Sequence, residues 1–296
     1  MSMNVIACVC LPSTMSEALE FYEDAFSVLP GQAFVREATA HYPSADVPES
    51  WAGMEGKELF ARARLRDLDL AFINAPGDVS ITPAISIMLT FDPAADADAA
   101  RHLRALWERL ADGGTALMPL DTYDFSPLFG WVRDRFGLTF QLRLASPGAE
   151  PRPFAMPALM FTSDEPRAEA AARTYTALIP GSAPGSLVRM PTSDHVLVSD
   201  ARLGEQWIML SDSPGMHTFG FTEGVSLMLE CDTQEEIDAA WEALATREFG
   251  GSWCEDAFGV RWQVVPTGLA SLIANPAVHR EIVSMTKIDL DRLRAV

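Results

Sequence analysis

The chain has 296 residues, with 22 Lys and Arg against 41 Asp and Glu, and therefore a formal net charge of −19 at pH 7. Hydrophobic residues make up 48% of it and charged residues 21%, which predicts a globular protein of about two domains. Because so acidic a chain without a basic cluster repels phosphate backbones and anionic lipid surfaces, nucleic acid and membranes are disfavoured as partners.

The first half predicts two successive βαβββ units. The apolar stretch 4–11 predicts a strand, Ser16 is expected to cap a helix ending near Phe26, and strands follow near 33–37, 58–65 and 69–74. The second unit begins with a strand at 84–91 and an amphipathic helix at 95–111. It ends with strands near 115–118, 130–134 and 138–144.

A linker separates this half from a second one of the same plan. Residues 146–153 contain three prolines and a glycine, which can continue neither a helix nor a central strand. Beyond them we expect a strand at 155–162, a helix at 165–179 and strands to 212, then a strand at 224–231, a helix at 233–245 and strands to 265. The predicted domains are 1–146 and 154–270, followed by a helical tail, 271–296, packed on the sheets or on a second subunit.

Internal repeats support this division. The segment 134–142 recurs at 256–264, Gly113-Gly114 recurs as Gly250-Gly251, and the segment 86–92 recurs at 226–232. A fixed order of repeated motifs predicts an architecture more firmly than any single propensity. The chain is therefore expected to be α+β, with four βαβββ units in two domains.

Cysteine usage and the N-terminal residues predict a cytoplasmic protein. The four cysteines form no C-x-x-C pair and lie mostly in strand-like segments, so buried free thiols are expected. The first residues lack a basic segment followed by an apolar run, and the longest uncharged stretches contain Pro, Gly and Ser.

The repeated motif Asp-x-Phe-Gly-x-x-aromatic-Gln, at 134–141 and 256–263, resembles the vicinal oxygen chelate superfamily, which includes glyoxalase I, extradiol dioxygenases and bleomycin resistance proteins. The text at 21–26, 85–88, 113–120 and 285–290 is similar to its PhnB-like branch. The resemblance covers nearly the whole chain. It implies two glyoxalase/bleomycin-resistance-type domains whose mixed sheets curve into cups.

Metal-dependent members of that superfamily typically place a final glutamate ligand on the closing strand. Gln141 and Gln263 occupy the matching positions, and a neutral amide lacks the charge that draws a divalent metal out of water. None of the five histidines lies on the strands that open the units. We therefore expect no metal site and no cofactor, although glutamine does serve as a ligand in some glyoxalases.

Members of the PhnB-like branch are often described as demethylubiquinone methyltransferases. Methyl transfer from S-adenosylmethionine usually needs a glycine-rich loop after a first strand, whereas here the strand 4–11 runs into Leu11-Pro12-Ser13-Thr14. We do not expect a methyltransferase.

Strand alternation selects the first candidate binding residues. Thr139 shares a face with Gln141, and Arg261 with Gln263, so these side chains line the cups if the superfamily geometry holds. The amides would then donate hydrogen bonds to a carbonyl or phosphonate-like oxygen, with Arg261 supplying positive charge. The alternative is that each amide satisfies backbone groups at a seam of the sheet.

Loops and strand ends supply the other candidates. Trp51 lies in a Pro- and Gly-containing region, 43–56, that would form either a lid over the first cup or a loop packed on the other domain. Asn74 and Asp212 end equivalent strands, where Asp212 is a candidate acid or base and both are candidate turn caps. His217 is a candidate general base or a solvated loop histidine.

Three functional hypotheses follow. The first is a metal-independent small-molecule binding protein of the sequestering or resistance type, and the second is a glyoxalase-like lyase or isomerase acting on an enolisable carbonyl through Asp212 or a histidine. In the third, the second half only buries the sheet edge of the first. The tandem repeat predicts either a monomer that forms a pseudo-dimer internally or a homodimer.

Overall fold

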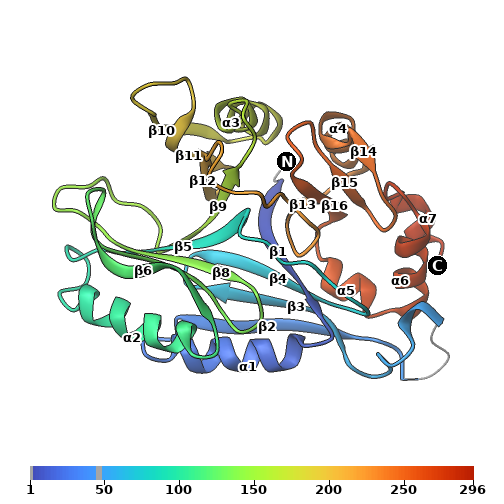
Figure 1. Cartoon of the computed structure of the whole chain (residues 1–296). Coiled ribbons are helices and arrows are strands. Elements are labelled where there is room, and N and C mark those ends of the chain that lie inside the picture. The colour runs from blue at the N-terminus through green and yellow to red at the C-terminus, as the bar shows by residue number, and fades with distance from the viewer. Residues whose placement is uncertain (1–2, 45–48) are drawn as a thin grey trace.

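The computed structural model describes residues 3–44 and 49–296 and contains the four predicted βαβββ units (Figure 1). Two units form the first half. Their elements are β1 (Asn4–Pro12), α1 (Met15–Phe26), β2 (Phe34–His41), β3 (Glu58–Leu65) and β4 (Leu68–Ala75), then β5 (Ile85–Phe91), α2 (Ala99–Ala111), β6 (Thr115–Tyr123), β7 (Ser126–Arg133) and β8 (Thr139–Leu144). A short 3-10 turn, Glu49–Trp51, precedes β3.

The second half repeats this order and adds a helical tail. Its elements are β9 (Ala155–Phe161), α3 (Ala168–Leu178), β10 (Ala183–Arg189), β11 (Val196–Leu203), β12 (Gln206–Asp212), β13 (Val225–Cys231), α4 (Gln234–Leu244), β14 (Arg247–Glu248), β15 (Trp253–Glu255), β16 (Arg261–Pro266), α5 (Leu269–Ile273), α6 (Pro276–Ser284) and α7 (Leu290–Arg294). None of the described helices is long and apolar enough to cross a membrane.

The strands form two eight-stranded mixed sheets, and each sheet combines one unit from each half. Sheet A has the order β14-β15-β16-β13-β1-β4-β3-β2, and sheet B has the order β10-β11-β12-β9-β5-β8-β7-β6. The halves meet in two antiparallel seams, β1 with β13 and β5 with β9. Neither sheet closes into a barrel, which confirms the predicted α+β class with curved mixed sheets.

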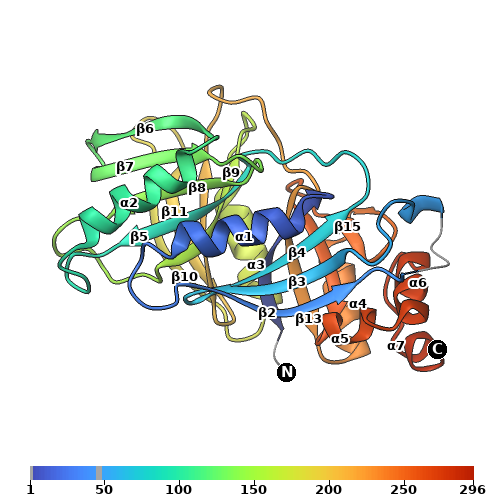
Figure 2. The ribbon, with the colours of Figure 1, turned by 90° about the horizontal axis from the view of Figure 1, so that it is seen from below.

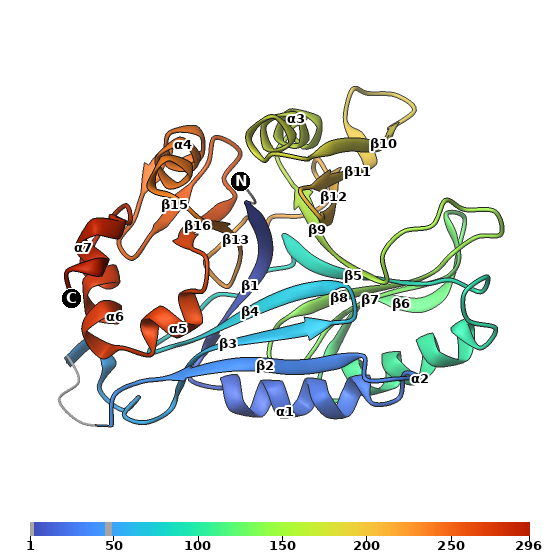
Figure 3. The same cartoon turned by 180° about the vertical axis from the view of Figure 1, so that it is seen from behind.

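The helices cover the outer faces of these sheets, two on each half. Figure 2 shows α1 and α2 side by side on the first-half strands, and Figure 3 shows α3 and α4 on the second-half strands. Helix α1 buries residues at three- and four-residue spacing, from Met15 through Leu19 and Tyr22 to Phe26. Every residue of β5 and of β13 is buried, as expected for central strands covered on both faces.

The repeated Asp-x-Phe-Gly motif has a structural explanation. Asp134 Oδ1 accepts hydrogen bonds from the backbone amides of Phe136 and Leu138, and its Oδ2 accepts one from the Tyr22 hydroxyl at 2.8 Å. Asp256 makes the equivalent turn in the second half and accepts from Tyr175 at 2.6 Å. In each half the motif therefore joins the first helix to the turn before the last strand. These contacts connect the two units of the same half on the helical side, whereas each sheet pairs one unit from each half.

Some predicted boundaries and one predicted cap were wrong. Ser16 does not cap α1: the helix begins at Met15, and the Ser16 hydroxyl donates to Glu58 instead, at 2.7 Å. The Met15 amide is capped from a neighbouring strand, by Asn74 Oδ1 at 3.3 Å. The predicted helices at 95–111 and 165–179 begin later, at Ala99 and Ala168.

The C-terminal tail packs on sheet A and on α4. Helix α5 contacts β2 and β3, so the tail reaches the first half of the chain. The Gln234 side chain donates to the carbonyl of Ile288 and accepts from the amide of Leu290, and Lys287 pairs with Asp238 at 2.6 Å. These contacts hold α6 and α7 over one end of the sheet.

Candidate functional site

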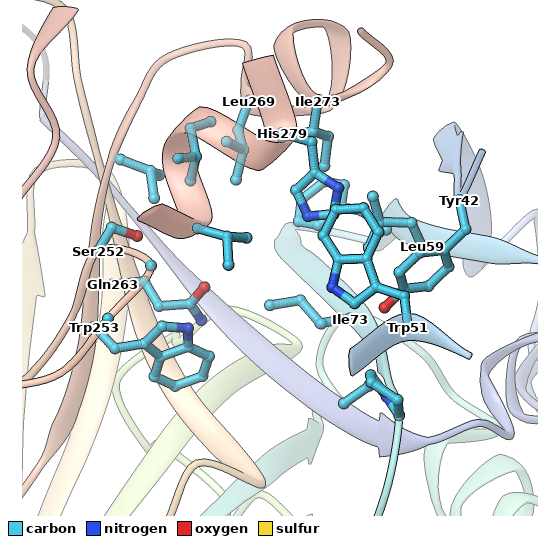
Figure 4. A pocket seen from close by; sticks show the side chains of 18 residues that line it. Tyr42, Trp51, Leu59, Ile73, Ser252, Trp253, Gln263, Leu269, Ile273 and His279 are labelled. Carbon is cyan, nitrogen blue, oxygen red and sulfur yellow. The ribbon is translucent and has the colours of Figure 1, made fainter. Parts of the chain in front are cut away.

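A cavity of about 340 Å³ lies between the concave face of sheet A and the C-terminal helices (Figure 4). Both halves line it, because sheet A contains a unit from each. Most of its walls are apolar, formed by Leu59, Phe60, Ile73, Val265, Leu269, Ile273, Ile282 and Val283, together with the aromatic rings of Tyr42, Trp51 and Trp253. This volume lies within the range of small-ligand pockets, roughly 300 to 1,000 Å³.

Gln263 supplies the amide on one wall. It lies on β16 opposite Trp253 of β15, and both line the cavity. Its Nε2 donates to the Ser226 hydroxyl at 2.9 Å, while its Oε1 has no hydrogen-bond partner among the described residues. One acceptor therefore faces a mostly apolar space (Figure 4).

An aromatic stack forms the opposite wall. The Trp51 ring lies parallel to the His279 imidazole, with centroids 4.4 Å apart, and Tyr42 packs edge-on against Trp51. The Tyr42 hydroxyl donates to the backbone carbonyl of Asn74 at 2.7 Å, which fixes this ring. The stack joins the segment before β3 to helix α6.

His279 is a neutral polar group in this wall. Burial, with a smaller contribution from the nearby Arg280 charge, lowers its pKa to about 4, so the imidazole is uncharged at neutral pH. Its Nδ1 is buried and has no hydrogen-bond partner. The cavity thus has polar side chains on two facing walls, Gln263 and His279.

The residues around Gln263 do not fit a divalent metal. Among the described residues no group of three or more His, Cys, Asp or Glu side chains is placed to hold one. Cys8 lies across the seam from Ser226, and burial raises the pKa of its thiol to about 12, opposed by hydrogen bonds to Gln263 and Ser226. A protonated thiol, a hydroxyl and an amide are a poor ligand set.

The loop between β1 and α1 is not a glycine-rich cradle for a nucleotide-like methyl donor. Only Ser13 and Thr14 separate β1 from α1, and neither is a glycine that would let a backbone cradle approach such a group.

Of the predicted binding residues, Gln263 and Trp51 meet in this cavity and Arg261 does not. Arg261 precedes Gln263 by two residues but pairs with Glu255 at 3.1 Å and stacks over Phe249, outside the lining. The predicted lid, 43–56, lies partly outside the described residues, at 45–48. Its described part includes Trp51, which is buried in the wall.

Thr139 and Gln141 lie on sheet B instead. Gln141 faces the concave side beside Trp131 and Met88, its partners in register. The Thr139 hydroxyl is 2.8 Å from that of Ser86, so it is satisfied within the protein.

Asn74 and Asp212 occupy equivalent capping positions. Asp212 accepts three backbone hydrogen bonds, from Arg167 and Ala168 at the start of α3 and from Val196 at the start of β11, at 2.8 to 3.0 Å. Asn74 accepts from Met15 and donates to the Glu58 carbonyl. These contacts favour the capping interpretation and leave the Asp212 carboxylate little capacity for chemistry.

His217 lies at sheet B, away from the cavity. Its ring stacks on Phe219, with centroids 4.9 Å apart, and meets the edge of Trp131. Neither Asp212 nor His217 lines the cavity.

Sequence reasoning missed Tyr42 and His279. His279 lies on the buried side of α6 with Val278 and Ile282, and a polar side chain within such an apolar face was the available signal. Its contact with Trp51 joins residues more than 200 positions apart, and no local pattern predicts that.

The family model described as 3-demethylubiquinone-9 3-methyltransferase matches residues 3–143 and 154–265. Glyoxalase I from Zea mays is 11% identical, with a TM-score of 0.54 over 89% of this chain and 93% of its own, which shows a shared fold. A Bacillus cereus structure titled putative 3-demethylubiquinone-9 3-methyltransferase, PhnB protein, is 26% identical over 47% of this chain and 98% of its own, with a TM-score of 0.39. No curated protein matches.

Proposed function

The chain belongs to the family described as 3-demethylubiquinone-9 3-methyltransferase, as a tandem two-domain member of the vicinal oxygen chelate superfamily, and from that premise we propose that it is a metal-independent small-molecule binding protein. The observation that carries the proposal is the cavity of about 340 Å³ in sheet A. Its lining is apolar except at a few polar groups, which is the usual character of a ligand pocket.

The polar atoms indicate which ligand fits. Gln263 Oε1 is without a partner, and the His279 imidazole is uncharged, so each of its ring nitrogens either donates or accepts according to the tautomer. The Trp51 ring and the aliphatic walls favour a flat, uncharged molecule. We therefore propose an aromatic or conjugated ligand that carries one hydrogen-bond donor for Gln263.

Cysteine chemistry and the sheet seams support two further parts of the proposal. All four cysteines are buried and free, as expected in a reducing compartment, which supports a cytoplasmic protein. Both seams between units lie within one chain, which supports a monomer that contains its own pseudo-dimer.

A neutral dye tests the binding proposal. N-phenyl-1-naphthylamine has a flat naphthalene ring, a phenyl ring and one N–H donor, and its fluorescence rises in apolar surroundings. With EDTA present, we expect saturable binding to the wild type and affinity about tenfold or more lower in Trp51→Leu, because the aromatic wall is lost.

Trp207→Leu is the matched control, since it removes a half-buried tryptophan from sheet B. It should leave the affinity within about twofold of wild type. Dye binding that requires added metal, or that falls equally in both variants, would refute the proposal.

A further inference from the structure

The concave face of sheet B has a different chemistry from the cavity in sheet A. In one row across four strands, Trp131 of β7 lies opposite Gln141 of β8, Gln141 opposite Met88 of β5, and Met88 opposite Met156 of β9. Residues paired in register share a face of a sheet. Figures 1 and 3 show that α2 and α3 lie on the other side of this sheet, and that the tail helices lie near sheet A.

Three side chains on this face carry hydrogen-bond donors without acceptors. Trp131 Nε1 is buried and has no partner, and Arg143 Nε is likewise buried and unpartnered. Gln141 is 6% exposed, and its amide makes no hydrogen bond to a described residue. Buried donors in folded proteins are almost always paired, so the two buried donors of Trp131 and Arg143, beside the free amide of Gln141, indicate an acceptor that binds there.

Arg143 adds a positive charge that forms no ion pair with a described carboxylate, although Asp200 is near enough to raise its pKa. It lies in register between Thr90 and Phe129, and its one hydrogen bond is a long contact of 3.5 Å to the Thr90 hydroxyl. Burial lowers its pKa, partly opposed by Asp200 and reinforced by Arg152, but a guanidinium stays charged in proteins. Arg152, on the same side of the sheet, differs because Asp200 and Glu150 both pair with it.

The rest of the face is apolar and polarisable. Met88, Met156 and Ala158 form a buried cluster with Phe129 and Trp131, against which Met209 packs. Methionine side chains adapt to flat rings and make favourable contacts with them. The face therefore combines an apolar surface with hydrogen-bond donors and the guanidinium of Arg143, which makes no ion pair within the described part of the chain.

We propose that the concave face of sheet B is a second binding site, which takes an apolar, aromatic carboxylate held by Arg143, Gln141 and Trp131. The carboxylate supplies the acceptor oxygens that these donors lack, and its ring system packs on the half-buried Met160 and Met209 at the margin of the cluster. The site shares no residue with the cavity in sheet A, so this inference does not depend on the function proposed for that cavity.

A pair of probes that differ in charge tests the site. 1-Naphthoate and 1-naphthamide share a ring system, but only naphthoate is an anion. We expect the indole N–H resonance of Trp131, assigned with Trp131→Phe, to shift saturably as naphthoate is added to the full-length protein. Naphthamide should bind about tenfold or more weakly, because it lacks a charge-assisted bond to Arg143.

Variants of Arg143 test whether its guanidinium binds the carboxylate of naphthoate. Arg143→Gln should lower naphthoate affinity about tenfold or more without affecting naphthamide, and Arg143→Lys should retain part of the naphthoate affinity. Arg261→Gln is the control, because Arg261 lies on sheet A, where Glu255 forms an ion pair with it.

Equal affinities for the two probes would overturn the proposal. So would wild-type naphthoate affinity in Arg143→Gln, or a Trp131 resonance that does not move. If naphthoate shifts the resonances of Trp51 and Trp253 instead, it binds in the sheet A cavity, and the second site is refuted while the first is not.

Discussion

Asn74 and Asp212 occupy equivalent capping positions with different side-chain groups, an amide and a carboxylate. Asn74 Nδ2 donates to the Glu58 carbonyl at the start of β3, whereas Asp212 Oδ2 accepts from the Val196 amide at the start of β11. Both side chains also accept from the first amides of a helix. The exchange of amide for carboxylate therefore follows the local backbone and requires no difference in reactivity.

Asp212→Ala should lower the free energy of unfolding by about 2 to 4 kcal/mol, because buried backbone donors lose their acceptor. Urea unfolding measures the loss, and dye affinity in the sheet A cavity should not change. Asp194→Ala, at an exposed position, should be neutral. A variant with wild-type stability that had lost a chemical turnover would instead support Asp212 as a catalytic residue.

Sequence reasoning at this scale was strongest where alternation fixed a face. It placed Gln263 beside the cavity and Gln141 on the concave side of sheet B. It did not separate Arg261 from Gln263, because alternation gives the face and not the direction of a long side chain. Glu255, on the adjacent strand, turns Arg261 away.

Among the elements, the Tyr22–Asp134 contact joins helix α1 to the turn between β7 and β8. Burial raises the pKa of Asp134 to about 6, although the Tyr22 hydroxyl and backbone amides oppose this. The folded protein therefore binds this proton more tightly than the unfolded chain, whose Asp pKa is about 3.9. The resulting stabilisation is present below about pH 4 and is lost as the pH rises through about 6.

The pH dependence of unfolding tests this contact. Relative to Asp134→Asn, the wild type should lose up to about 3 kcal/mol of unfolding free energy between about pH 4 and pH 6.5. Tyr22→Phe should move the window to higher pH, because the tyrosine hydrogen bond lowers the Asp134 pKa. Parallel stability curves for wild type and Asp134→Asn would contradict this account.

The strands and the four main helices could be predicted as elements because each has a strong local pattern. The tail could not be predicted in detail. Helices α5 and α7 have five residues each and are stabilised by packing and caps such as Asp289, not by length. Their place over sheet A depends on contacts with α4 and with the first half.

For the whole molecule, the sequence repeat predicts four units but not how they pair. Each seam joins strands that are buried throughout or nearly so, so hydrophobic pattern alone does not show that β1 pairs with β13 and β5 with β9. The pairing places residues of both halves around one cavity. The boundaries 1–146, 154–270 and 271–296 remain predictions about units of folding.

The central claim is that the sheet A cavity binds a small uncharged molecule without metal. Ile73→Trp should fill this cavity from β4, whereas Met160→Trp adds the same ring to the concave side of sheet B. The most direct measurement is a fluorescence titration of all three proteins with N-phenyl-1-naphthylamine in EDTA. We predict that affinity falls about tenfold or more in Ile73→Trp alone. Undiminished binding by Ile73→Trp, or binding by the wild type only after a divalent metal is added, would contradict the account.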